Sequence, residues 1–316
     1  MILEGTGHIE LPAHAGPGGF DHAAVHGRRG RLYVAHTAND ALDVIDCATG
    51  TYLRSIPRLT GVAGVLVSEA DDLVFTSNRG EDTVGVFSPA REDALVKVKV
   101  GRRPNGLAYA AERRLLLAAN VGDPSVPGSY TVSIVDLAAE ATIADVPVAG
   151  RTRWAVFDPG TASFHVNVAD PPQIAIIEAG HPGRVARTIA VPAAGPHGLE
   201  LDVASGRLFC ACDAKRLLAL DARSGDVLAE AMLAGVPDVI FLNRHLRHLY
   251  VAVGDPGLIE VFETDRLRRL ETVPTERGAH TLGFDPMRDT VYALLPETHR
   301  AATYRDLGSH SRHEAG

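Results

Sequence analysis

The sequence is dominated by an internal repeat that recurs seven times along its 316 residues. One copy, residues 196–233, reads PHGLELDVASGRLFCACDAKRLLALDARSGDVLAEAML. It contains four short runs, separated by turn-forming groups such as Ser205-Gly206 and Ser224-Gly225. Runs of this length with period-two alternation are typical of strands. We therefore expect strands over residues 197–202, 207–212, 216–221 and 227–233.

The spacing of the copies predicts the architecture. Aligned on the second strand of each unit, the equivalent positions are Leu32, Leu73, Leu115, Phe164, Leu208, Leu249 and Val291. Subtracting successive positions gives spacings of 41, 42, 49, 44, 41 and 42 residues. Periods in the forties with four strands per unit indicate a β-propeller, in which each small sheet covers the apolar face of its neighbour. The sequence therefore predicts an all-β, seven-bladed propeller of four-stranded antiparallel blades.

The last unit is incomplete, and the missing strand is found at the other end of the chain. Unit seven ends after its third strand, near Tyr304, whereas HIELPAHAGPGG from His8 reads like TIAVPAAGPHG from Thr188. We predict that residues 7–12 pair with the last blade and close the ring, which removes two open sheet edges. Residues 1–306 are then a single domain, and residues 307–316 are a polar C-terminal tail.

Composition narrows the classes of partner. The chain carries 31 basic and 39 acidic residues, a formal net charge of -8, and its arginine pairs are scattered. This distribution argues against nucleic acid or an anionic membrane as a partner. We find no apolar run near the roughly 20 residues of a membrane span and no signal peptide pattern, and the three cysteines do not suggest a disulfide framework. A cytoplasmic location is expected; the oligomeric state is not indicated.

Polar residues are predicted to meet on the propeller axis. The first strand of every blade lines the central channel, so equivalent positions in these strands form rings of side chains. One such ring consists of His22, Ala63, Asn105, Trp154, His197, Asp238 and His280. An apolar layer is expected two residues further along each strand, and small residues such as Gly64, Gly106 and Gly198 stand between the layers, where blades pack closely.

This ring is compatible with two kinds of chemistry. His22, His197, His280 and Asp238 could together hold one divalent metal ion, since imidazole and carboxylate groups are common metal ligands. Without a metal, one histidine could act as general base and another as general acid, while Arg153 neutralises an oxyanion. A plain alternative also stands: the polar residues bind only ordered water and make the ring rigid.

Two further residues of the ring are candidate ligand contacts. Trp154 offers a flat apolar wall for a ring or acyl group, and Asn105 lies at the same depth as the histidines. Both are predicted to bind substrate.

The repeat units also resemble a known family. GRRPNGLAYAAERRLLLAANVGD from Gly101 and AGPHGLELDVASGRLFCACDAKRLLALDARSGDVL from Ala194 are similar to the YVTN/YncE-type propeller repeat, which is also met in lactonase-like propellers. That wider group includes lactonases, a muconate cycloisomerase, a streptogramin lyase and non-enzymatic binding proteins. The resemblance implies a small organic ligand at one mouth of the channel; no complete catalytic set of a named family maps onto the ring.

These observations lead to one leading hypothesis and two rivals. The leading one is a hydrolase or lyase acting on a small lactone, ester or related carbonyl compound in the channel. The first rival is a non-catalytic propeller that binds a small ligand or peptide, and the second is a metal-free isomerase.

Overall fold

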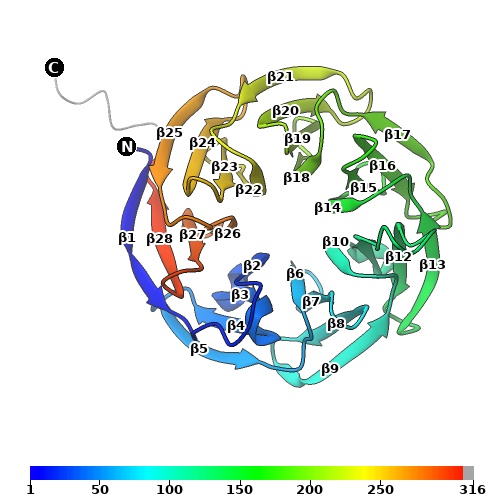
Figure 1. Cartoon of the computed structure of the whole chain (residues 1–316), viewed down its shortest axis with the longest axis horizontal. Helices are drawn as coiled ribbons and strands as arrows, with labels where there is room; N and C mark the ends of the chain where they lie inside the picture. The colour runs from blue at the N-terminus through cyan, green and yellow to red at the C-terminus, as the bar shows by residue number, and fades with distance from the viewer. Residues whose placement is uncertain (309–316) are drawn as a thin grey trace.

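The computed structural model describes residues 1–308 and confirms the seven-bladed propeller (Figure 1). Each blade is a four-stranded antiparallel sheet, and the seven sheets surround a central channel. Residues 309–316, most of the predicted polar tail, lie outside the described part of the chain.

Blades 1 to 3 follow one another in chain order. Blade 1 consists of β2 (Ala23–His26), β3 (Arg31–His36), β4 (Ala41–Asp46) and β5 (Thr51–Ile56). Blade 2 consists of β6 (Val62–Ser68), β7 (Leu73–Asn78), β8 (Thr83–Ser88) and β9 (Arg91–Lys99). Blade 3 consists of β10 (Pro104–Ala110), β11 (Leu115–Asn120), β12 (Thr131–Asp136) and β13 (Ala141–Pro147).

The remaining blades complete the circle. Blade 4 consists of β14 (Thr152–Asp158), β15 (Ser163–Val168), β16 (Gln173–Glu178) and β17 (Arg187–Ala190). Blade 5 consists of β18 (Pro196–Asp202), β19 (Arg207–Cys212), β20 (Arg216–Asp221) and β21 (Val227–Met232). Blade 6 consists of β22 (Pro237–Asn243), β23 (His248–Val253), β24 (Leu258–Glu263) and β25 (Arg269–Pro274). Blade 7 combines β26 (Thr281–Asp285), β27 (Thr290–Leu295) and β28 (Arg300–Asp306) with β1 (Leu3–Glu10).

Blade 5 shows how the repeat encodes its sheet. Its four strands lie within one residue of the predicted ranges. In β19 and β20 the apolar residues are buried on both faces, because neighbouring blades cover both sides of the sheet. The turn into β21 is held by Asp221, whose carboxylate accepts hydrogen bonds from the backbone N–H groups of Arg223 and Ser224.

The two ends of the chain close the ring, as predicted. β1 pairs antiparallel with β28, with Gly7 opposite Thr303 and Ile9 opposite Ala301. The observed strand begins earlier than the predicted range, because Leu3 is buried in the core between blades 6 and 7. It ends earlier because Pro12 has no N–H group with which to continue the ladder.

Small residues near the axis allow the blades to touch. A Cβ atom on Gly64 would lie 2.1 Å from the backbone oxygen of Asn105 in the next blade, and one on Gly198 would lie 2.5 Å from the backbone oxygen of Asp238. Further out, apolar clusters join adjacent sheets; Phe209 of blade 5, for example, belongs to the same buried cluster as Ile240 of blade 6. The first strands are therefore held at fixed positions around the channel.

Helices and cysteines play only minor parts. Within residues 1–308 the helices are three short 3-10 turns, η1 (Gly27–Arg29), η2 (Thr37–Asn39) and η3 (Ala111–Arg113), and none could cross a membrane. The three cysteines are free and buried.

Candidate functional site

Charged side chains gather at one end of the channel. They come from the first residues of the first strands, or the residues just before them, and from the connections that follow the second strands. We call this group the charged mouth; its members are Asp21, Arg79, Arg153, His197, Asp213, Asp238 and His280.

Asp238 is the centre of the charged mouth. One of its carboxylate oxygens, Oδ1, lies 3.1 Å from Nε2 of His197, and the other, Oδ2, lies 3.0 Å from Nδ1 of His280. The three residues come from blades 5, 6 and 7, so the propeller ring brings them together. Burial by itself would raise the pKa of the Asp238 carboxyl, but the two imidazoles hold it well below its usual range. Asp238 is therefore an ionised carboxylate that bridges two histidines.

His197 is held on both sides of its ring. Its Nδ1 lies 2.8 Å from Oδ1 of Asp213, and its Nε2 faces Asp238. Burial disfavours the charged ring, yet Asp238 and Asp213 outweigh this effect and raise the pKa of His197 to about 9. Nη1 of Arg153 lies 3.2 Å from the same Nε2 and opposes protonation, while Nη2 of Arg153 pairs with Asp213 at 3.3 Å. At neutral pH His197 is thus an imidazolium ion with both nitrogens engaged.

His280 differs because only one of its nitrogens faces Asp238. Its side chain is 38% exposed, compared with 13% for His197. Burial lowers its pKa, but the hydrogen bond and charge of Asp238 outweigh burial and raise it overall. The carboxylate fixes Nδ1 and the ring orientation, which leaves Nε2 as the nitrogen that can exchange a proton with a ligand.

Arginines surround the other half of the charged mouth. Nη2 of Arg79 donates to Asn105 at 2.8 Å and pairs with Asp21 at 3.2 Å. Burial and the neighbouring positive charges of Arg153, Arg103 and Arg79 lower the pKa of Arg151. Blades 2 to 4 therefore supply positive charge, whereas carboxylates and imidazoles come from blades 5 to 7 and blade 1.

Two residues of the predicted ring stand at the inner boundary of this network. The rings of His22 and Trp154 stack against each other with their centroids 4.1 Å apart, and both line a cavity beneath the charged mouth. Burial lowers the pKa of His22, so its imidazole is neutral at pH 7. Nε2 of His22 lies 3.4 Å from Asp21. Asn105 binds Arg79 and is almost fully buried, so its amide positions that arginine.

The predicted metal site is not confirmed. Among residues 1–308 no group of three or more His, Cys, Asp or Glu side chains is arranged to hold a metal ion. The reason lies in the contacts just described: Asp238 uses both oxygens and His197 both nitrogens on other partners, and His22 packs against Trp154. These donors do not form a ligand set for a divalent ion.

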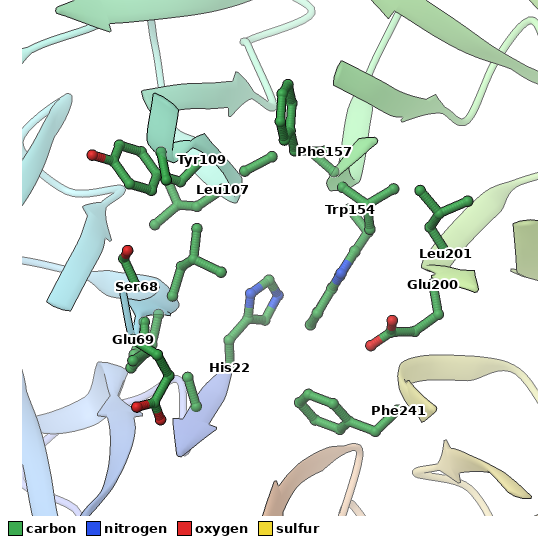
Figure 2. Close-up of a pocket in the computed structure, with 18 of the residues that line it drawn as sticks. His22, Ser68, Glu69, Leu107, Tyr109, Trp154, Phe157, Glu200, Leu201 and Phe241 are labelled. Carbon is green, nitrogen blue, oxygen red and sulfur yellow. The ribbon is translucent and has the colours of Figure 1, made fainter. Parts of the chain in front are cut away.

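The cavity beneath occupies the opposite end of the channel. It has a volume of about 470 Å³ and is lined by the first strands of blades 1 to 6 and the turns that follow them (Figure 2). His22, Trp154, Glu200 and Phe241 surround its centre. We call it the turn-side cavity. The channel is thus divided into a charged mouth and a largely apolar cavity, with His22 and Trp154 between them.

Sequence reasoning missed Asp213, Arg79 and Glu200. Asp213 and Arg79 follow the second strands of their blades and read as turn residues. The pairing of Pro196 with Cys212 places Asp213 next to His197. This strand register is the observation from which the contact between Asp213 and His197 could have been predicted. Glu200 is a single acidic residue between Leu199 and Leu201, with no distinguishing pattern.

Comparisons with known proteins support the fold. No family model and no curated protein matches the chain. Among solved structures, Kuenenia stuttgartiensis hydrazine synthase superimposes with a TM-score of 0.81 at 13% identity, covering 94% of this chain and 97% of that one. A chain of the mitotic checkpoint complex superimposes with a TM-score of 0.79 at 11% identity, covering 96% and 92% respectively. At such identities the likeness defines a β-propeller, and the resemblance to YVTN/YncE-type repeats stays a resemblance.

Proposed function

We propose that the protein is a hydrolase or lyase that acts on a small lactone, ester or related carbonyl compound at the charged mouth. The observation that carries the proposal is the pair formed by Asp238 and His280, in which the carboxylate orients the imidazole and leaves Nε2 for proton transfer. An imidazole held in this way by a carboxylate is the arrangement that acid–base catalysis requires.

In hydrolysis of a lactone or ester, His280 would act as the general base and Arg153 would stabilise the oxyanion. The neutral form of His280, which is favoured above its raised pKa, accepts a proton from water at Nε2 while the water oxygen bonds to the carbonyl carbon. The resulting oxyanion is stabilised by the positive charge of Arg153, which is held at the charged mouth by its pairing with Asp213 at 3.3 Å. The proton on His280 then passes to the leaving oxygen as the carbon–oxygen bond breaks. His197 stays protonated between Asp213 and Asp238 and keeps the carboxylates in place.

The same groups suit a lyase reaction. His280 would remove a proton from the carbon next to a carbonyl group, and the positive charge of Arg153 would stabilise the enolate that forms. The bond between the β-carbon and its oxygen substituent would then break as the carbon–carbon double bond forms, releasing a carboxylate, or an alcohol whose oxygen takes the proton from His280. Neither reaction requires a nucleophilic side chain.

The test compares His280→Ala with His181→Ala. His181 has a 79% exposed side chain on the outer part of blade 4, so its variant is a matched control. The substrates are γ- and δ-lactones, followed by pH-stat titration, and p-nitrophenyl acetate, followed by absorbance. We expect His280→Ala to lower kcat about 100-fold or more, the contribution typical of a general acid–base, and His181→Ala to leave it unchanged.

Other results would separate the rival functions. Turnover that is equal in the His280→Ala and parent proteins would contradict the proposal. Loss of turnover with a chelator, restored by one divalent metal, would favour the metal-dependent mechanism instead. Rearrangement of a substrate without addition or elimination would indicate an isomerase, and binding without any turnover would indicate a non-catalytic propeller.

A further inference from the structure

The turn-side cavity is a second site that the acid–base chemistry does not use. It opens between the connections that follow the first strands, among them Glu69, Pro159 and Val203. Its volume of about 470 Å³ is in the range of cavities that hold small organic ligands. None of Arg153, His197, Asp238 and His280 lines it.

The walls of the cavity are aromatic and aliphatic. Trp154 and Phe241 face its centre from blades 4 and 6 (Figure 2). Leu107 and Val65 cover the side towards blades 2 and 3. Apolar groups of a ligand would gain about 25 cal/mol for each Å² that these walls remove from water. Aromatic faces also attract cations, because their rings carry negative charge above the plane.

One carboxyl group reaches into these apolar surroundings. Glu200 extends from β18 into the cavity between Trp154 and Phe241 (Figure 2). Burial raises its pKa to about 7, although Arg244 acts in the opposite direction. Nη2 of Arg244 donates to the backbone oxygen of Leu201 at 2.8 Å. Arg244, which also lines the cavity, and the backbone N–H groups of Leu201 and Leu242 offset only part of the effect of burial on this pKa.

The other acidic residue of the lining is already paired. Glu69 accepts a hydrogen bond from Nε of Arg28 at 3.0 Å and lies 3.3 Å from Nδ1 of His26. His22, the remaining ionisable group beside Trp154, is buried and neutral at pH 7. Glu200 is thus the group in the cavity that gains most from a positively charged partner.

We infer that the turn-side cavity binds a hydrophobic amine, with its ammonium group paired to Glu200 and its apolar body against Trp154 and Phe241. Such a ligand places a second positive charge, in addition to Arg244, beside the Glu200 carboxylate and fills the apolar space at the same time. A neutral ligand of the same shape would fill the space without forming an ion pair with the Glu200 carboxylate. An anionic one would add a like charge beside it.

The single tryptophan of the chain, Trp154, makes the inference measurable. Three probes that do not absorb at its excitation wavelength differ only in their end group: 4-cyclohexylbutylamine, 4-cyclohexylbutanol and 4-cyclohexylbutyrate. Fluorescence titration at pH 8 gives the dissociation constant of each. We expect the amine to bind at least tenfold more tightly than the alcohol, and the carboxylate most weakly. Amine binding should tighten between pH 6 and pH 8, as Glu200 loses its proton.

Two variants decide whether Glu200 causes the preference for the amine over the alcohol. Glu200→Gln keeps the shape of the side chain and should reduce amine affinity to that of the alcohol, while the alcohol binds as before. Glu4→Gln removes the same charge from an exposed position on β1. It should change neither the affinity for the amine nor the affinity for the alcohol. Equal affinity for the amine and the alcohol, or unchanged amine binding in Glu200→Gln, would overturn the inference. Failure of all three probes to alter Trp154 fluorescence would overturn it as well. Because these readouts measure binding at the far end of the channel, they do not depend on lactone or ester turnover.

Discussion

Replacing His197 by glutamine should reveal how strongly its proton stabilises the folded propeller. The pKa of His197 is about 9 in the folded protein, against an ordinary value of 6.5. The difference of about 2.5 units corresponds to about 3 kcal/mol, at about 1.4 kcal/mol per unit. Because the folded pKa is the higher one, this contribution is complete below pH 6.5 and is lost as the pH rises through 9. Its side chain is 13% exposed, so solvent screens the interaction only weakly.

The effect should be visible in thermal unfolding. An unfolding entropy of about 2.1 cal/mol/K per residue gives about 0.66 kcal/mol/K for 316 residues, so about 3 kcal/mol corresponds to about 5 °C in Tm. Calorimetry of the parent protein and of His197→Gln between pH 6 and pH 10 provides the comparison. We expect the Tm gap between the two proteins to shrink by about this amount from pH 6 to pH 10.

The difference between the two proteins isolates His197, because all other titrating groups are present in both. Glutamine also breaks contacts with Asp213 and Asp238, but that loss shifts Tm by an amount that does not follow the titration of the imidazole. A Tm gap that is the same at pH 6 and at pH 10 would refute the assignment of His197 as a proton-bound, doubly paired imidazolium.

Two further predictions concern the scaffold. Gly64→Ala should lower stability by about 1–3 kcal/mol, since its Cβ would lie 2.1 Å from the backbone oxygen of Asn105; calorimetry should show no comparable loss for Gly183→Ala, where a Cβ has open space. Ile9→Asp should destabilise the ring by about 2–5 kcal/mol and speed proteolysis near the N-terminus, because Ile9 is 3% exposed in the core between blades 7 and 1. The control for Ile9→Asp is His8→Ala, a substitution at the exposed neighbouring position. Equal proteolysis rates for the two variants would contradict the role of β1 as the closing strand.

The sequence predicted the propeller well because each repeat is locally complete. Alternation, turn residues and spacing define every blade by itself, as the strands of blade 5 illustrate. Closure by the first strand was also predictable, since an unpaired last blade needs a fourth strand. The bounds of β1 were less predictable, because they depend on where Leu3 is buried between blades.

The placement of the candidate site residues could be predicted only in part, because alignment places residues by position and not by side-chain direction. His197 and Asp238 both lie within their first strands, and His280 directly precedes its own; the three meet as expected. His22 directly precedes the short strand β2, and its ring lies against Trp154 instead. Asp213 lies in the connection after β19, so its contact with His197 depends on the register between β18 and β19. The alignment of the repeats does not reveal this register.

The closing pair of strands also determines when the ring can be completed. Thr6 and Thr303 are hydrogen-bonded across a separation of 297 residues, so β1 cannot pair until β28 has been synthesised. Blade 7, from which His280 reaches Asp238, lacks its outer strand until then. A chain truncated before β28 would therefore leave β1 without a strand partner and β27 paired with β26 alone, and His280 would stand beside an incomplete sheet.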